Sequence, residues 1–236
     1  MFKYSFAGVL GALLVCGLPQ AQAKEINKYY VEAFGGASKN LIGQPETATE
    51  KSGGNFNGVA KEMNLSSGRV AGLRLGYVPS NAWRFDLSYY DTTNDMVWKT
   101  YFPTSYGNYK GVVSSKSLLA TAYYTFTPIG KLSPYVGAGV GVGQNTLKSV
   151  TESYSPTPYS YIDSGEVTGA KYRIATGVDY SITPKMKLNL DISALYLGEA
   201  SSGSYRSING SKSPIGKFEF KDIGLADITV GLRYSF

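Results

Sequence analysis

The side chains of this chain that could do chemistry are mainly carboxylates, because the 236-residue sequence contains no histidine and only one cysteine, Cys16. Without histidine, a serine nucleophile has no imidazole base, so the common hydrolase arrangement is excluded. Carboxylate-only catalysis stays open at Asp86, Asp179 or Asp191, although structural ion pairs are the more common use of such residues. We therefore expect no enzymatic activity and no cofactor.

Metal sites are not expected either, since the usual cysteine and histidine ligands are missing. Carboxylates in the predicted loops have the oxygen ligands that Ca²⁺ prefers, but their spacing matches no calcium-binding loop. They are Asp91, Asp95, Glu152, Asp163 and Glu166. Solvated surface charges are the better interpretation of these residues.

The segment PYVGAGVGVGQN (134–145) has a glycine at every second position, starting at Gly137. A dinucleotide-binding fingerprint would need its third glycine where this chain has Val142, and no helical pattern follows. A period of two is instead typical of a β-strand, whose successive side chains point to opposite faces. We predict that the glycines leave room for bulky side chains of neighbouring strands, such as Tyr123 and Arg173.

Eight segments show this alternation, with one parity apolar or aromatic and the other small, polar or charged. They span residues 29–37, 69–78, 83–91, 117–126, 134–145, 171–182, 186–196 and 225–236. Each has a length close to the 9–11 residues of a tilted membrane strand. An even number of such strands is what a closed antiparallel bacterial barrel requires.

We therefore predict an all-β fold, an eight-stranded antiparallel up-and-down transmembrane β-barrel with four long external loops and three short periplasmic turns. A soluble β-sandwich shows the same alternation, but the strand lengths and the aromatic residues near strand ends favour the barrel. The short connections are 78–83, 127–134 and 183–186, and the long ones are about 38–68, 92–116, 144–169 and 198–220. Their alternating lengths place both termini on the periplasmic side.

In the barrel interpretation the apolar parity faces lipid, and the charged residues of the other parity point into the lumen. The predicted lumen charge network comprises Glu32, Arg74, Arg84, Asp86, Arg173, Asp179, Lys187, Asp191, Asp227 and Arg233. Acidic and basic residues are equal in number in this set. Because side chains largely fill an eight-stranded barrel, we expect ion pairs that plug the lumen, and a continuous hydrophilic pore is the alternative.

The N-terminus is typical of a secretory signal peptide, with Lys3, a short apolar run and an Ala-Gln-Ala end. We expect cleavage after Ala23, which removes Cys16 and leaves residues 24–236 as a barrel domain without disulfides. Acylation of Cys16 is a less favoured alternative, since Val15 is larger than the residue that normally precedes such a cysteine. The chain has a net charge of +6, but its charged residues form no block of like charges. This argues against nucleic acid as a partner.

The chain ends in ITVGLRYSF, with an apolar or aromatic residue at every second position. These residues are Ile228, Val230, Leu232, Tyr234 and Phe236. The pattern resembles the carboxy-terminal signal of outer-membrane β-barrels, which implies recognition by the barrel-assembly machinery. Together with SPYVGAGVGVG (133–143) and WRFDLSYY (83–90), it is similar to the OmpA-type and Opa-like superfamily of eight-stranded barrels, which includes bacterial surface antigens. The resemblance implies an integral location in the bacterial outer membrane, with loops exposed at the cell surface.

The predicted loops are rich in tyrosine and serine, a mixture that binding surfaces use because tyrosine gives a large contact area at low entropic cost. Candidate binding residues are Trp98, Tyr101, Tyr106, Tyr109, Tyr154, Tyr159, Tyr161 and Arg206. We expect them to bind a host-surface protein or glycan, or an envelope partner, as in an adhesin or surface antigen. Contact with outer-membrane lipid and lipopolysaccharide, or packing of loop against loop, is the alternative use of the same aromatic residues. A narrow porin-like channel and a structural envelope role are the alternative functions.

Overall fold

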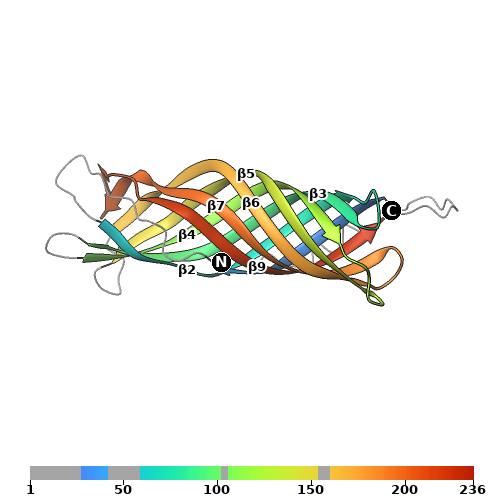
Figure 1. The fold of residues 1–236 in the computed structure, drawn as a ribbon. Helices are drawn as coiled ribbons and strands as arrows, with labels where there is room; N and C mark the ends of the chain where they lie inside the picture. Colours follow the sequence, from blue (N-terminus) through green and yellow to red (C-terminus); the bar gives the residue numbers. More distant parts are fainter. Residues whose placement is uncertain (1–27, 42–58, 102–105, 154–159) are drawn as a thin grey trace.

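The computed structural model describes residues 28–41, 59–101, 106–153 and 160–236, which lie almost entirely in β-strands (Figure 1). The strands are β1 (Tyr29–Asn40), β2 (Val59–Tyr77), β3 (Trp83–Tyr101), β4 (Tyr106–Thr125), β5 (Leu132–Ser153), β6 (Ser160–Ser181), β7 (Met186–Ile208), β8 (Ser211–Pro214) and β9 (Glu219–Ser235). None of the described residues forms a helix long and apolar enough to cross a membrane. The predicted signal peptide, residues 1–23, lies outside the described residues.

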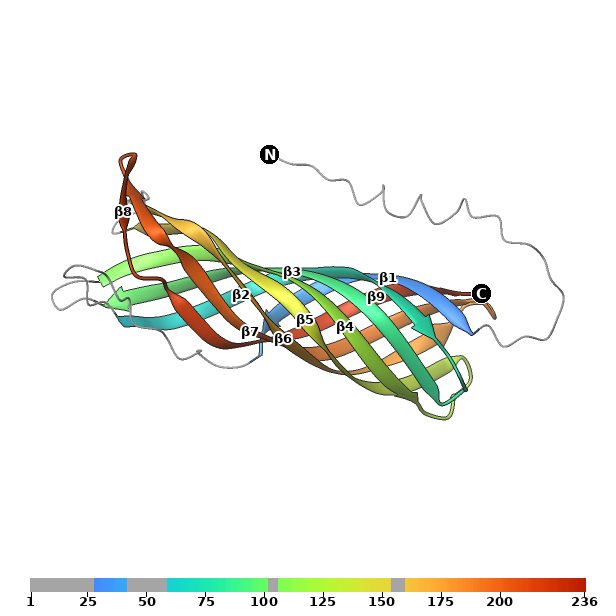
Figure 2. The same ribbon diagram turned by 90° about the horizontal axis from the view of Figure 1, so that it is seen from above.

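Eight of the strands form a closed antiparallel ring. Neighbours pair in the order β6-β5-β4-β3-β2-β1-β9-β7, and β6 pairs with β7 to close the ring. The short strand β8 pairs with β7 and forms a hairpin that projects at one end of the barrel (Figure 2). The predicted eight-stranded antiparallel barrel is therefore confirmed. The ninth strand, β8, pairs only with the end of β7 and is not part of the barrel wall.

The first and last strands meet at the end of the barrel that carries the short turns. The N–H of Phe236 donates to the carbonyl of Tyr29 at 2.9 Å, and the N–H of Tyr29 donates to the carbonyl of Phe236 at 3.3 Å. The same end holds the connections from β2 to β3, from β4 to β5 and from β6 to β7 (Figure 1). Short turns mark the periplasmic end of outer-membrane barrels, so the opposite end is external.

The strands are longer than the sequence pattern indicated, with 19 to 23 residues in each of β2 to β7. Much of the stretches expected as loops, 92–116, 144–169 and 198–220, is strand. In β3, the outward residues are aromatic or aliphatic from Trp83 to Tyr89 and mainly polar from Asp91 onward, with Val97 as an apolar exception, whereas the buried residues become apolar at Met96 and Trp98. The apolar face thus changes from outside to inside where the strand leaves the lipid, and this reversal hides the strand from a search for membrane segments.

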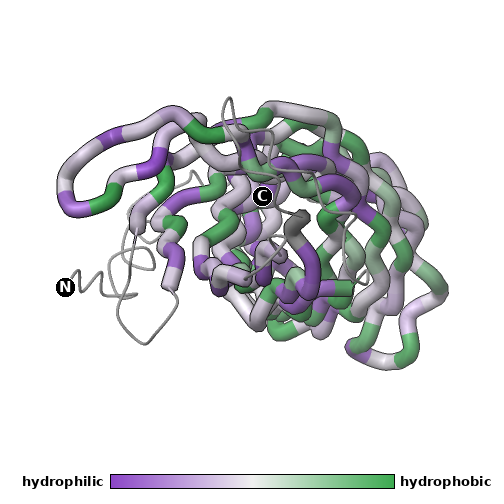
Figure 3. Tube along the Cα trace, turned by 90° about the vertical axis from the view of Figure 1, so that its left-hand side faces the viewer, coloured by the Kyte–Doolittle hydropathy of each residue, from purple (hydrophilic) through white to green (hydrophobic). Residues whose placement is uncertain are grey.

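Outward side chains of the periplasmic half of the barrel form an apolar belt. Figure 3 shows the alternation of hydrophobic and hydrophilic residues along the strands that produces it. Members of the belt include Leu75, Leu87, Val140, Ile174, Leu190 and Ile228, all exposed. Beside a short turn, Trp83 packs edge-on against Tyr124 with ring centroids 5.4 Å apart, as in an aromatic girdle at a membrane interface.

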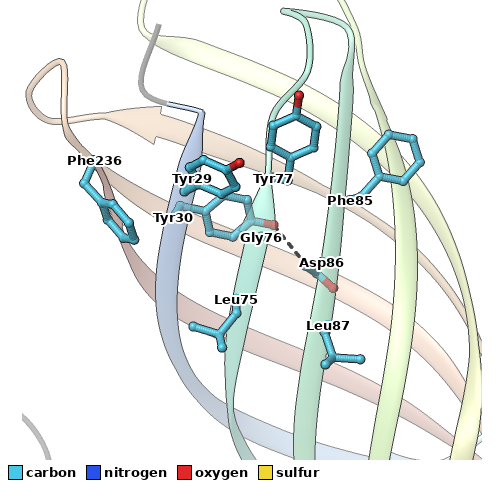
Figure 4. Close-up of a pocket in the computed structure, with 9 residues that line it drawn as sticks. All are labelled: Tyr29, Tyr30, Leu75, Gly76, Tyr77, Phe85, Asp86, Leu87 and Phe236. Atoms are coloured by element: carbon cyan, nitrogen blue, oxygen red, sulfur yellow. Dashed lines mark hydrogen bonds between the residues drawn. The ribbon is translucent and has the colours of Figure 1, made fainter. Parts of the chain in front are cut away.

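A shallow groove lies on this belt near the periplasmic end (Figure 4). Its lining residues are Tyr29, Tyr30, Leu75, Gly76, Tyr77, Phe85, Asp86, Leu87 and Phe236. The outer residues are aromatic or aliphatic, whereas the Tyr30 hydroxyl lies behind them and donates to Asp86 at 3.1 Å. A Cβ at Gly76 would lie 2.0 Å from the Tyr30 ring, so glycine is needed there. The groove is part of the lipid-facing surface, and its polar floor belongs to the interior.

The glycine run lies on the inner face of β5 and has two roles. A Cβ at Gly137 would lie 2.4 Å from the Tyr123 ring, which confirms that this glycine leaves room for a bulky neighbour. At Gly141 the nearest atom would be the backbone oxygen of Leu118, 2.0 Å away, so this glycine permits close approach of β4 and β5. Arg173 on β6 is the register partner of Gly139, but the three atoms nearest to a Cβ there belong to Thr121 and Ala120, so the part predicted for Arg173 in filling that space stays a prediction.

Candidate functional site: a filled interior and an exposed external patch

The periplasmic half of the interior holds charged side chains that pair with one another. Glu32 on β1 forms ion pairs with Arg74 on β2 and Arg233 on β9, the latter through Nε and Oε2 at 2.8 Å. Arg233 also reaches Asp179 on β6 at 2.6 Å, and Arg84 on β3 reaches the same Asp179 oxygen at 2.8 Å. All of these side chains are at most 4% exposed. The ion pairs therefore link five strands across the lumen.

A further ion pair, between Arg173 on β6 and Asp191 on β7, is fully buried and begins a second group. The Tyr135 hydroxyl donates to Asp191 at 2.8 Å. The Asn189 amide donates to the Tyr135 oxygen and to Asp179, each at 2.8 Å. Both ion-pair groups thus belong to one network, in which hydrogen bonds offset part of the cost of removing charges from water.

Tyrosines that sequence reasoning left out of the network complete it. Arg74 donates to the Tyr90 hydroxyl at 2.8 Å, and Arg173 donates to the Tyr123 hydroxyl at 3.2 Å. The Arg84 guanidinium lies 4.1 Å from the centroid of the Tyr123 ring, within the range of a cation–π contact. Both tyrosines occupy the same alternating strand positions as the charged residues, and this pattern was the one sequence signal that could have placed them in the lumen. The signal was ambiguous because tyrosine is also common in lipid-facing girdles.

The three other predicted members of the network differ from one another. Asp86 is buried and accepts the hydrogen bond from Tyr30. Lys187 is half-buried near the periplasmic end. Asp227 is fully buried, and neither of its carboxylate oxygens has a hydrogen-bond partner among the described residues.

The external half of the interior holds an apolar layer in place of the charge network. Trp98 and Tyr109 are 2% and 3% exposed and stack with ring centroids 5.3 Å apart. Phe218 and Phe220 pack edge-on against Trp98, at 5.5 and 5.2 Å. Trp98 and Tyr109 are therefore interior packing residues and not exposed binding residues, which corrects the prediction. The cause is that β3 and β4 continue beyond the lipid and turn these rings inward.

A polar clamp closes over this apolar layer at the external end. The fully buried Glu152 on β5 accepts hydrogen bonds from the Tyr109 hydroxyl at 2.8 Å and from the Ser160 hydroxyl at 2.6 Å, and it pairs with Arg206 on β7. Arg206 also donates to Ser160 at 3.1 Å. Arg206, predicted as an exposed binding residue, is 6% exposed and holds β5, β6 and β7 together. This corrects its assignment too.

Two of the candidate residues, Tyr101 and Tyr106, lie with two charged residues that the sequence did not single out, Glu62 and Lys99. Together they form a solvent-accessible patch on β2, β3 and β4, which we call the external patch; Tyr106 is exposed and Tyr101 is partly exposed. Tyr101 and Tyr106 face each other across β3 and β4 with ring centroids 6.0 Å apart. Lys99 Nζ lies 2.7 Å from Glu62 Oε2 and 5.9 Å from the Tyr106 ring centroid. The Tyr101 hydroxyl donates to Glu62.

The two charged residues of the external patch each favour the charged form of the other. Hydrogen bonds from Lys99 and, second, from Tyr101 lower the pKa of Glu62, and the same bond to Glu62 raises the pKa of Lys99. A carboxylate with a lowered folded-state pKa loses its pairing only as the pH falls through that lowered value. At neutral pH the patch therefore presents a fixed pair of charges beside two aromatic rings.

Three predicted binding residues remain, Tyr154, Tyr159 and Tyr161, and the structure adds one exposed tyrosine that was not predicted. Tyr161 on β6 is 58% exposed, as expected for a binding residue. Tyr205 on β7 is 50% exposed and was not singled out from the sequence. Tyr154 and Tyr159 lie outside the described residues.

The residues of the predicted assembly signal lie on β9 and at its end. Ile228, Val230, Leu232 and Phe236 are exposed on the lipid-facing side, and Tyr234 is partly exposed. The pattern that resembles an assembly signal is therefore, in the folded barrel, one outward face of the last strand.

A closed antiparallel ring, an apolar outer belt and an interior filled by side chains define a small outer-membrane β-barrel. The family described as "Outer membrane protein beta-barrel domain" matches residues 8–236, and the chain belongs to this family. Its integral outer-membrane localisation follows from this family and from the fold.

Other outer-membrane proteins are similar to this chain in sequence or in fold. A curated relative, an uncharacterized outer-membrane protein y4mB of Sinorhizobium fredii, is 28% identical over 149 residues, which are 59% of this chain and 62% of that protein. The chain thus matches less than two thirds of that relative's length. OprG from Pseudomonas aeruginosa has a TM-score of 0.52 at 16% identity, over 90% of this chain and 100% of OprG. Neisserial surface protein A has a TM-score of 0.48 at 19% identity, over 88% and 97%.

Proposed function

We propose that this protein is a non-enzymatic surface-recognition barrel whose external face binds a protein or glycan of a host cell or of the envelope, as adhesins and surface antigens do. The external patch carries the proposal. Its aromatic rings and its ion pair stand on paired strands beyond the lipid belt, and Tyr106 is 54% exposed. Tyrosines held on a rigid ladder lose little entropy on binding, so they suit a recognition surface.

The packing of the interior supports the same function. Ion pairs and tyrosines occupy the periplasmic half of the described barrel, and the rings around Trp98 occupy the external half. A barrel that is filled at both levels acts through its surface, because function in small barrels sits on segments that the scaffold presents.

We also propose two partners within the bacterial envelope, lipopolysaccharide and the barrel-assembly machinery. Exposed cations lie on the outer face just beyond the apolar belt, at Lys39, Arg69 and Lys116, where the phosphates of lipopolysaccharide would neutralise them. The outward face of β9, which ends at Phe236, is the segment that the barrel-assembly machinery would recognise.

The external patch gives the direct test of recognition. Replacing both of its tyrosines, Tyr101→Ser and Tyr106→Ser, removes two facing aromatic surfaces while the surrounding ladder is retained. We expect attachment of cells displaying this variant to epithelial cells, matrix proteins or immobilised glycans to fall at least tenfold. The measurement is a whole-cell binding screen with equal surface display, verified by protease accessibility.

The matched control is a facing tyrosine pair at the opposite end of the barrel. Tyr29 and Tyr77 lie on neighbouring strands with ring centroids 5.3 Å apart, near the periplasmic turns. The variant Tyr29→Ser with Tyr77→Ser should bind as the native protein does. Native attachment of the Tyr101→Ser/Tyr106→Ser variant would contradict the assignment of the patch.

A narrow channel is the second candidate function. It is favoured by buried polar atoms in the middle of the barrel that have no partner in the described residues, among them Thr92 Oγ1 and Thr121 Oγ1, because such atoms suit a hydrated interior. Since Arg84 is enclosed by Asp179 and Tyr123, we expect no steady unit conductance from refolded protein in planar bilayers. Steady conductance that changes in Arg84→Ala would replace the recognition proposal with the channel.

A further inference from the structure

One buried carboxylate in the barrel stands apart from the ion-pair network. Asp227 on β9 is 0% exposed, and neither of its oxygens has a hydrogen-bond partner among the described residues. An isolated ionised carboxylate is very costly to remove from water, so its charge has to be neutralised inside the folded barrel.

The neighbouring arginines do not neutralise it. The periplasmic network contains four buried arginines and, without Asp227, four buried carboxylates, so its fully buried charges are balanced. The arginines are Arg74, Arg84, Arg173 and Arg233, and the carboxylates are Glu32, Asp86, Asp179 and Asp191. The half-buried Lys187 does not reach Asp227, because it lies opposite Arg233, six residues or roughly 20 Å along β9 from Asp227. Asp191 is the register partner of Thr229, two residues along β9 from Asp227, and it holds Arg173 in an ion pair. Asp227 is the carboxylate left over.

Arg206, buried at the external end, pairs with Glu152. The other buried cation outside the network, among the described residues, is Lys171, and it is engaged elsewhere. Its ammonium donates to Asn145 Oδ1 at 2.7 Å and to the carbonyl of Leu197. Leu197 lies four residues along β7 from Ser193, the residue opposite Asp227, and four strand residues span roughly 13 Å. Lys171 therefore does not reach the carboxylate.

Hydroxyl oxygens surround Asp227 on the same inward face. Ser193 on β7 and Ser38 on β1 are its direct register partners, and Thr229 lies two residues along β9. Opposite side chains in an antiparallel pair have Cβ atoms about 4.5–5.5 Å apart, close enough to share one ion. The hydroxyls of Ser193 and Thr229 are buried and also lack a partner among the described residues, whereas Ser38 bonds to Asn94.

We propose that Asp227 anchors an internal site for a monovalent metal cation, Na⁺ or K⁺, with the hydroxyls of Ser193 and Thr229 and water as further ligands. Oxygen donors suit hard cations. The single negative charge that Asp227 contributes is neutralised by one positive charge, whereas calcium sites usually combine several carboxylates. The cation would hold β7 and β9 together at mid-barrel, between the ion-pair network and the apolar layer around Trp98.

Crystals of the detergent-refolded native protein provide the direct test. When Na⁺ and K⁺ are replaced by Tl⁺, we expect an anomalous difference peak between the side chains of Asp227, Ser193 and Thr229. No peak at that position, with Tl⁺ peaks elsewhere on the molecule, would overturn the proposal.

Unfolding equilibria provide an independent readout. At fixed pH and ionic strength, the native protein should be more stable in NaCl or KCl than in N-methylglucamine chloride. At a cation concentration ten times the dissociation constant, the unfolding equilibrium shifts about tenfold. Asp227→Asn should remove the difference, and Ser193→Ala should weaken it. Asp95→Asn, a change at an exposed carboxylate on β3, should retain it.

Two results of the unfolding experiment would overturn the proposal. The first is equal stability of the native protein in metal and N-methylglucamine chlorides, which would mean that Asp227 is neutralised by a proton or by a rearranged Arg173. The second is a metal-ion effect of the same size in Asp227→Asn. Because the Tl⁺ experiment uses the native protein, it decides the question even if Asp227→Asn fails to fold.

Discussion

Arg233→Met should lower the free energy of unfolding by about 3–5 kcal/mol, the cost typical of removing one partner from a buried ion pair. Arg233 is the side chain that joins the two carboxylates Glu32 and Asp179, and its guanidinium lies 4.6 Å from the Tyr30 ring centroid. Methionine keeps much of the volume but leaves both carboxylates short of one charged donor. The measurement is urea unfolding of the refolded barrel in detergent micelles, followed by tryptophan fluorescence.

The matched control for this substitution is an ion pair of the same kind in water. Lys99 pairs with Glu62 at 2.7 Å, and both side chains are more than two fifths exposed. Because exposed ion pairs contribute little to stability, Lys99→Met should unfold at the same urea concentration as the native protein, within error. An equally small effect of Arg233→Met would mean that water screens the interior charges, and the channel would then become the better functional candidate.

The lipid-facing half of the fold could be predicted from the sequence because each strand there obeys one rule. An apolar residue faces lipid and its neighbour faces the lumen, so parity alone assigns Leu75 to the outside and Arg74 to the inside. The alternation does not, however, predict which acidic and basic side chains form ion pairs with each other. That Arg84 pairs with Asp179, across the lumen and 95 residues along the chain, depends on strand order and stagger, which only the closed barrel defines.

The external half could not be predicted in the same way, because the rule reverses there. Beyond the lipid the outer face meets water and the inner face becomes the dry one, so Trp98 turns inward while Lys99 turns outward. A tyrosine-rich polar stretch with reversed alternation has the composition of a loop, and Tyr109 was therefore assigned to a binding surface. Glu152 likewise gave no signal of burial, since its partner Arg206 is 54 residues away.

Gly141→Ala should lower the free energy of unfolding by about 3 kcal/mol or more, at or beyond the upper end of typical overpacking costs. The added Cβ would lie 2.0 Å from the backbone oxygen of Leu118 and 2.8 Å from the Cα of Leu119. Backbone atoms cannot rotate away as a side chain does, so the β4–β5 ladder itself has to shift. The readout is the fraction of heat-modifiable, folded barrel on refolding, together with the urea midpoint of whatever folds.

The matched control is Gly169 on β6, where an added Cβ meets no atom within 4 Å among the described residues. Gly169→Ala should therefore stabilise the barrel slightly, by about 0.5–1 kcal/mol, because alanine restricts the unfolded chain more than glycine does. If the change in the free energy of unfolding has opposite signs in the two variants, glycine is required at position 141 because β4 and β5 approach closely there, and not because the strand needs a flexible residue. If Gly141→Ala folds with native stability, β4 and β5 can separate at low cost. The barrel wall would then tolerate a wider spacing between these two strands than the close backbone contacts at Gly141 indicate.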